Sequence, residues 1–298
     1  GDVYKRQTML KRAITIIIVA AGAMTMHGQT AVRFGNEVSD TTMINELLES
    51  RGASQNFANA ESRVALFARS FEGTPYGSHT LEGDPEMLTV RLDSLDCTTF
   101  VETAMALAYT SMESRRSWRD FVYNLQRMRY RGGNVNGYPS RLHYICDWIV
   151  DNRHRGIFTD VTDHFPRVSY IMRTIDFMTS NRELYPALAD SSNYARMRDL
   201  ENGYRQHRFP YIKTNDLALK ATKAELHDGD VVALVSNLKN LDVTHLGIIV
   251  KDSPDAEPYL LHASSSDGKV EVSKLPLDQF MKKNRQWLGL RVIRLINN

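Results

Sequence analysis

Cys97 is one of only two cysteines in the chain and stands where a helix is expected to begin. Asp96 before it is a good N-cap for the apolar periodic segment that follows. A cysteine at a helix N-terminus meets unpaired backbone N–H groups and the positive end of the helix dipole, which favour the thiolate. The thiolate is the form that attacks a carbonyl carbon, and the same N–H groups can hold an oxyanion. The position predicts a cysteine nucleophile.

Two histidines, His245 and His262, lie in apolar segments typical of β-strands. The turn signal between them is centred on Ser253 and Pro254. In a hairpin that is symmetric about this turn, His245 and His262 face each other directly, with Cβ atoms about 4.5–5.5 Å apart, and a diagonal offset still leaves them within reach. We expect the two imidazoles to form a relay, in which one takes the thiol proton and the other orients it.

Two alternatives use the same residues differently. In an exported protein Cys97 could form a disulfide with Cys146, although two cysteines are a sparse framework for a chain this long. Cys97, His245 and His262 could also bind zinc, with water as the fourth ligand. Because no His-Glu-x-x-His or Cys-x-x-Cys spacing accompanies them, we expect neither a metal nor a cofactor.

The elements that must position these residues differ between the two halves of the chain. Apolar residues recur near the helical period across 40–72 and again across 118–128. The polar middle, about 150–225, predicts helical pieces at 168–178 and 194–204 and is typical of an elaboration on a core.

The C-terminal third consists of β-branched runs separated by Asn, Asp, Gly and Pro. These runs predict strands at 230–235, 243–250, 259–263, 269–272 and 289–296. Helices followed by an antiparallel sheet predict an α+β fold, and we expect a single domain over 30–298.

The N-terminus predicts a secretory signal peptide over residues 1–29. Lys11 and Arg12 precede the short apolar run 13–24, which contains the small residues Ala21-Gly22-Ala23. The run is shorter than the about 20 residues of a membrane span. We therefore expect a periplasmic protein with no stable membrane span after processing, and the alternative is an N-terminal anchor helix.

Charge excludes one class of partner. The chain has 37 basic and 35 acidic residues, and loss of residues 1–29 would remove four basic side chains and one acidic one, leaving a net charge of −1. Such a balance gives no basic footprint for nucleic acid or for an anionic membrane surface.

Six short motifs follow one another along the chain: Pro75-Tyr76, Asp96-Cys97-Thr98-Thr99-Phe100-Val101-Glu102, Ser140-Arg141-Leu142-His143-Tyr144, Gly229-Asp230-Val231-Val232, His245-Leu246-Gly247 and His262-Ala263-Ser264. Together they resemble a family of bacterial N-acetylmuramoyl-L-alanine amidases within the NlpC superfamily of papain-like cell-wall cysteine hydrolases. The resemblance extends from about Glu61 to the C-terminus. It implies a papain-like NlpC-type fold, in which the cysteine-bearing helix packs on an antiparallel sheet, with a mostly helical insertion at about 150–225.

The resemblance also implies a catalytic triad. Cys97 would be the nucleophile, His245 the general base and acid, and His262 the residue that orients His245. Tyr76 would lie beside the thiolate and assist the oxyanion hole. The alternative for Tyr76 is an ordinary core aromatic whose hydroxyl bonds a carbonyl.

A second set of residues would line the substrate cleft on the same grounds: Glu82, Arg141, His143, Tyr144 and Trp148. Arg141 would bind a stem-peptide carboxylate through its planar fork. The alternative is a buried amphipathic segment in which Tyr144 and Trp148, at i and i+4, pack together. Cys146, where the family would carry a small polar residue, is expected to be a buried and inert thiol.

The activity implied is cleavage of the N-acetylmuramoyl–L-alanine bond of (1,6-anhydro)muropeptides through a thioester, with peptidoglycan fragments as partners. A stem-peptide endopeptidase of the same superfamily and a zinc-dependent amidase are the hydrolytic alternatives. A non-catalytic muropeptide-binding module is the alternative from another class.

Overall fold

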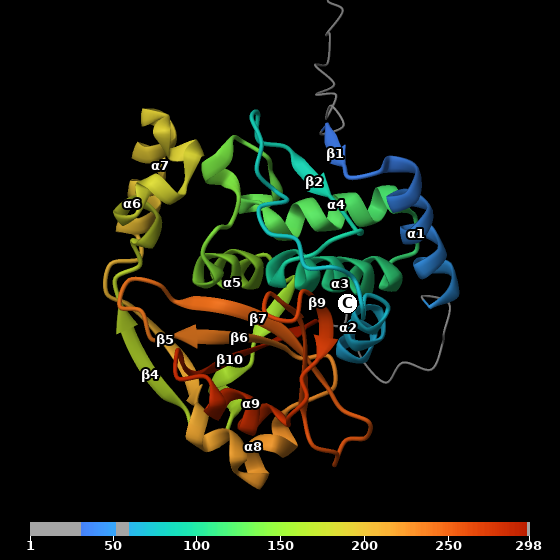
Figure 1. Ribbon diagram of the computed structural model, residues 1–298, viewed down its shortest axis with the longest axis vertical. Coiled ribbons are helices and arrows are strands. Elements are labelled where there is room, and N and C mark those ends of the chain that lie inside the picture. Colours follow the sequence, from blue (N-terminus) through green and yellow to red (C-terminus); the bar gives the residue numbers. More distant parts are fainter. Residues whose placement is uncertain (1–30, 52–59, 297–298) are drawn as a thin grey trace, which may run out of the picture. The chain divides into compact units, whose positions relative to one another are not determined.

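The computed structural model describes residues 31–51 and 60–296 (Figure 1). The signal peptide predicted for residues 1–29 lies outside this part of the chain. From Ala31 onward the contacts form one compact unit. Within the described residues, no helix is both long enough and apolar enough to cross a membrane.

Helices occur throughout the described chain. They are α1 (Glu37–Ser50), α2 (Ala60–Arg69), α3 (Cys97–Met112), α4 (Trp118–Arg129), α5 (Ile145–His154), α6 (Phe177–Ser180), α7 (Ser191–Asn202), α8 (Lys220–Glu225) and α9 (Leu277–Lys283).

The strands form two sheets, and most of them lie in the second half. They are β1 (Val32–Phe34), β2 (Leu88–Val90), β3 (Phe158–Asp160), β4 (Ser169–Arg173), β5 (His207–Lys213), β6 (Val231–Ser236), β7 (Val243–Val250), β8 (Tyr259–Ser264), β9 (Lys269–Val272) and β10 (Trp287–Leu295). The large sheet has the order β4-β5-β10-β6-β7-β8-β9, and β3 also pairs with β10. Its pairs are antiparallel, whereas β1 and β2 form a small parallel pair.

Helices cover the central strands on both faces. On one face α3 and α2 pack against β7, and on the other the apolar residues of α9 join the core with β6 and β8 (Figure 1). Strand β6 is therefore buried along its whole length, which explains its continuous apolar sequence. Helix α3 is buried at every position from Thr99 to Ser111, so it is a central helix whose first residue is Cys97.

This architecture confirms the predicted α+β class, with the cysteine-bearing helix on an antiparallel sheet. The five predicted strands are β6 to β10, and each end lies within two residues of its predicted position. The predicted helix at 118–128 is α4, and the helical stretch at 40–72 is two helices, α1 and α2.

The middle of the chain is less helical than expected. The segment 168–178, predicted as a helix, contains strand β4 and only the start of α6. Along β4, Tyr170 and Met172 are exposed while Arg173 is buried, and the strand pairs with β5 along its length. The sheet partner therefore decided the conformation of this polar segment. The prediction at 194–204 corresponds to α7.

Candidate active site

Cys97 is the first residue of α3, and a capping box fixes that start. The Asp96 carboxylate accepts a hydrogen bond from the Thr99 N–H at 2.7 Å, and the Thr99 hydroxyl accepts one from the Asp96 N–H at 2.9 Å. Reciprocal bonds of this kind hold the helix boundary at one residue. Cys97 is therefore held in the first turn, beside backbone N–H groups that no helical carbonyl can satisfy.

The sulfur of Cys97 reaches the sheet where β7 and β8 separate. The β7–β8 ladder covers only the pairs from Ile248–Leu261 to Val250–Tyr259. Ile249 donates its N–H to the Asp230 carbonyl, so by alternation the Leu246 N–H points to the β8 side, beyond the end of the ladder. Cys97 packs against the apolar cluster that contains Leu246, and the Leu246 N–H opposes the rise in the pKa of the Cys97 thiol. The sulfur therefore lies near the strand that carries His245.

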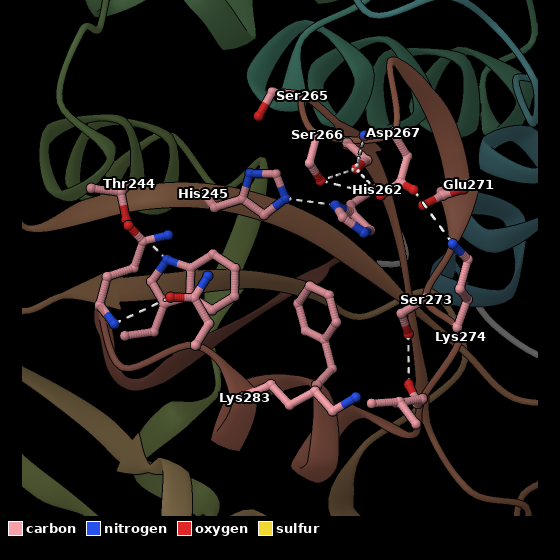
Figure 2. A pocket seen from close by; sticks show the side chains of 16 residues that line it. Thr244, His245, His262, Ser265, Ser266, Asp267, Glu271, Ser273, Lys274 and Lys283 are labelled. Atoms are coloured by element: carbon pink, nitrogen blue, oxygen red, sulfur yellow. Dashed lines mark hydrogen bonds and ion pairs between the residues drawn. The ribbon is translucent and has the colours of Figure 1, made fainter.

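His245 and His262 are in direct contact across the same gap. Nε2 of His245 lies 2.8 Å from Nδ1 of His262, and the two ring planes are nearly perpendicular, at 88° (Figure 2). The expectation that the imidazoles lie within reach of each other is confirmed.

The predicted register was wrong by two positions. Ile248 pairs with Leu261, so the hairpin is centred one residue later than expected, and His245 and His262 are diagonal neighbours instead of directly opposed. A shift of two positions keeps every side chain on its face of the sheet, which is why the contact survives.

The hydrogen bond between the rings can form with either ring as the donor. If His245 carries its proton on Nε2 and donates it to His262, Nδ1 of His245 keeps a lone pair. Among the described residues, Nδ1 of His245 has no hydrogen-bond partner, and Cys97 packs against the apolar cluster that contains the next residue, Leu246. In this tautomer the arrangement can accept a thiol proton at Nδ1.

Two aromatic rings fix the orientation of the pair. His245 stacks on Trp287 with ring centroids 5.8 Å apart, and His262 meets the edge of Phe280 at 5.3 Å. Trp287 is itself held by an indole N–H bond of 3.0 Å to the Thr244 hydroxyl. Contacts on both rings leave them little rotational freedom.

Burial keeps these groups uncharged at rest. It raises the pKa of the Cys97 thiol to about 11, and the Asp96 carboxylate adds to this, whereas the N–H of Leu246 and the Thr98 hydroxyl oppose it. Burial lowers the pKa of His245, as does the neighbouring His262, and burial also lowers the pKa of His262. These shifts favour a neutral thiol at Cys97 and neutral imidazoles at His245 and His262.

A cavity of about 540 Å³ opens beside the histidine pair (Figure 2). One wall carries His245 and His262, another carries Phe280 and Trp287, and the residues 264–267 form its rim. Neither Cys97 nor Tyr76 lines this cavity, but Gly268, just beyond its rim, accepts a 2.8 Å hydrogen bond from the Tyr76 N–H.

Tyr76 lies beside Cys97, as expected. It forms a β-bridge with Leu95, two residues before the cysteine. Burial raises the pKa of the Tyr76 hydroxyl, and the charges of Cys97 and Asp96 raise it further. At neutral pH the hydroxyl therefore keeps its proton and can donate a hydrogen bond.

The structure places Arg141 and Glu82 together, but away from the histidine pair. Arg141 is buried and forms ion pairs with Glu82 at 2.8 Å and Glu86 at 3.4 Å. Its charge is thus already compensated within the protein, which does not fit the expected role of binding a substrate carboxylate. Glu86 was missed because nothing in its sequence neighbourhood marks it.

The remaining cleft candidates have structural partners. His143 stacks on Tyr138 with centroids 4.3 Å apart, and its Nε2 bonds the Tyr138 carbonyl. Tyr144 is buried and donates to Glu201 at 2.7 Å, and Trp148 is buried against Phe158.

The prediction that Tyr144 and Trp148 line a cleft is therefore corrected: both are core residues. They do not pack on each other either, because they belong to separate apolar clusters.

Cys97 and Cys146 are both free thiols, and Cys146 is fully buried on α5. The disulfide alternative is therefore not realised. In the described ranges, 31–51 and 60–296, no group of three or more His, Cys, Asp or Glu side chains has the geometry to hold a metal ion.

Known proteins resemble this chain in sequence and in fold. A model of the AmiA-like family, described as N-acetylmuramoyl-L-alanine amidase-like, matches residues 66–290. A crystal structure of an N-acetylmuramoyl-L-alanine amidase from Bacteroides uniformis is 37% identical, with a TM-score of 0.73, over 80% of this chain and 99% of that one.

Two further solved structures are similar. One, from Bacteroides fragilis and named a putative xylanase, is 37% identical with a TM-score of 0.72, over 77% of this chain and 100% of that one. A protein from Legionella pneumophila shares the fold at 20% identity, with a TM-score of 0.68, over 87% of this chain and 95% of that one. No curated protein matches the chain.

Proposed function

Because the chain belongs to the AmiA-like, N-acetylmuramoyl-L-alanine amidase-like family, we propose that it is a cysteine amidase. The bond cleaved would join N-acetylmuramic acid to L-alanine in peptidoglycan fragments, including those with a 1,6-anhydro sugar. The observation that carries this proposal is the His245–His262 pair, in contact at 2.8 Å on two strands against which the helix that begins at Cys97 packs.

The first half of the reaction forms a thioester. Nδ1 of His245 takes the proton of the Cys97 thiol while the sulfur attacks the lactyl carbonyl carbon. The carbonyl oxygen becomes an oxyanion, which the Cys97 N–H and the Tyr76 hydroxyl can stabilise. The C–N bond then breaks, and His245 returns its proton to the departing amine of L-alanine.

The second half regenerates the enzyme. Water gives a proton to His245 and attacks the thioester carbonyl, and the C–S bond breaks as the sulfur recovers its proton. His262 touches no substrate atom in this scheme. It keeps the proton of neutral His245 on Nε2 and stabilises the imidazolium that forms.

The site of action would be the periplasm. The signal peptide predicted at residues 1–29 supports export, and peptidoglycan fragments occur in that compartment. A fusion of residues 1–30 to a periplasm-dependent reporter tests this proposal, and a reporter that stays inactive would contradict it.

Mass spectrometry of products from anhydro- and reducing muropeptides tests the activity. Wild type should release peptides with a free L-alanine amine, whereas Cys97→Ala should release none. Full activity of Cys97→Ala would refute the proposal. New free amines within the stem peptide would identify an endopeptidase. Inhibition by a chelator, without inhibition by iodoacetamide, would identify a zinc amidase.

Two further outcomes are informative. Tight fragment binding without turnover by wild type would identify a binding module. Xylan should also be tested, because the Bacteroides fragilis structure is named a xylanase. We expect the protein to release no sugar from it.

A further inference from the structure

A second cavity, of about 690 Å³, lies apart from the histidine pair. Three segments form it: the loop 82–86, the turn around Gly137 and Tyr138, and the start of α7 with the short 3₁₀ helix Pro186–Ala189 before it. None of its lining residues belongs to the first cavity.

The lining is acidic. Four of its side chains are carboxylates, Glu82, Asp84, Glu86 and Asp190, and none is basic. Three of them have protein partners, since Glu82 accepts from Arg141, Asp190 caps α7 through the Asn193 N–H, and Glu86 accepts from Tyr130 through one oxygen. Asp84 is exposed. The lining therefore attracts positive charge.

Arg141 does not cancel this charge. It lies beneath the lining with both Glu82 and Glu86 around it, so one guanidinium faces two carboxylates. Asp84 and Asp190 remain in addition. The resemblance implies that Arg141 binds a substrate carboxylate, but the lining of this cavity carries more negative than positive charge.

Glu86 supplies an independent observation. Its side chain is only 2% exposed, and its Oε2 has no hydrogen-bond partner. The other oxygen, Oε1, is occupied by the Tyr130 hydroxyl at 2.7 Å. A buried carboxylate oxygen without a donor is costly, and a ligand that brings an N–H donor removes that cost.

We propose that this cavity binds the side-chain ammonium group of a diamino acid in the stem peptide, with Glu86 as the central acceptor and Asp84 and Asp190 at the rim. The inference rests on the proposed function for the identity of the peptide. An ammonium group fits better than a metal ion, because these carboxylates do not form a metal-binding group.

A chain of charged side chains joins Glu86 to the helix that begins at Cys97. Glu102 lies five residues beyond Cys97, about 7.5 Å along α3. It pairs with Arg129 at 2.6 Å, and Arg129 in turn acts electrostatically on Glu86.

The test compares two muropeptides that differ only in whether the side-chain amine of the third residue is free or acetylated. Wild type should show a KM about tenfold lower for the free amine, as one charged hydrogen bond provides. Glu86→Gln and the exposed variant Asp84→Asn should bring the two KM values together. Glu49→Gln, on the exposed face of α1, is the matched control and should keep the difference.

Equal KM values in wild type, or an equal rise for both substrates in Glu86→Gln and Asp84→Asn, would overturn the inference. Calorimetry separates it from the proposed function, with Cys97→Ala protein and the free tripeptide, amine free or acetylated. Amine-dependent binding without cleavage by wild type would leave this site intact and refute the amidase. Cleavage that does not depend on the amine would support the amidase and refute the amine-binding site.

Discussion

Nε2 of His245 lies 2.8 Å from Nδ1 of His262, and this contact spans the gap beyond the last pair of the β7–β8 ladder. Helix α3, which begins with Cys97, packs against both of these strands. The ring of His245 is held by His262 and by stacking on Trp287. The end of the ladder therefore leaves room for a pair of imidazoles beside the helix that carries the cysteine.

Asp96→Asn should make the Cys97 thiol more acidic. The substitution keeps a side chain that can cap α3 but removes the charge that raises the thiol pKa, so the pKa should fall below about 11. The rate of iodoacetamide alkylation against pH measures it. Asp93→Asn, on an exposed residue, is the control and should titrate as wild type does; an unchanged profile in Asp96→Asn would contradict the assignment.

The pH dependence of activity and stability should reflect the neutral histidine pair. Their folded pKa values lie below the ordinary 6.5, so kcat/KM should not fall as pH passes through 6.5. The stability that these two groups contribute is complete above 6.5 and is lost as the pH falls through their lower folded values. Urea midpoints and kcat/KM between pH 7 and 4 test both, and an acid limb centred near 6.5 would be inconsistent with burial of the pair.

His262→Ala should lower kcat by about 100-fold with little change in KM, because His245 loses the group that fixes its tautomer. His262→Gln supplies a side-chain acceptor and should recover part of the loss. The acid limb of the pH profile should also move in His262→Ala. Equal losses in both variants with an unmoved pH profile would indicate a packing role alone.

Gly247→Ala should destabilise the β7–β8 hairpin. A Cβ at Gly247 would lie 2.5 Å from Leu260 Cδ1 and 3.1 Å from the Leu261 carbonyl oxygen, so the strands must move apart. We expect a loss of about 1–3 kcal/mol in the free energy of unfolding, measured by urea denaturation. Gly73→Ala, where a Cβ has open space but φ is +87°, separates backbone strain from crowding.

Glu102→Ala should cost about 3–5 kcal/mol in the free energy of unfolding, because it leaves the buried guanidinium of Arg129 without its counter-charge. Asp93→Ala breaks the exposed pair with Arg91 and should cost less than about 1 kcal/mol. Chemical denaturation measures both, and similar losses in the two variants would be unexpected.

Local sequence alone determined the elements that carry the chemistry. Asp96 and Thr99 fix the first turn of α3 through bonds that span only three residues, and the strands with His245 and His262 follow from apolar runs bounded by turn residues. Such signals act over short separations and do not depend on the rest of the fold.

The tertiary structure decided what the residues do there. The hairpin offset, the end of the β7–β8 ladder and the packing of the Cys97 helix on these strands all require contacts between distant segments. The same holds for Arg141, whose charge is taken by Glu82 and Glu86, and for Trp148, which is buried in the core. Charge compensation and burial depend on which segments meet in space, and residue type and spacing do not specify that.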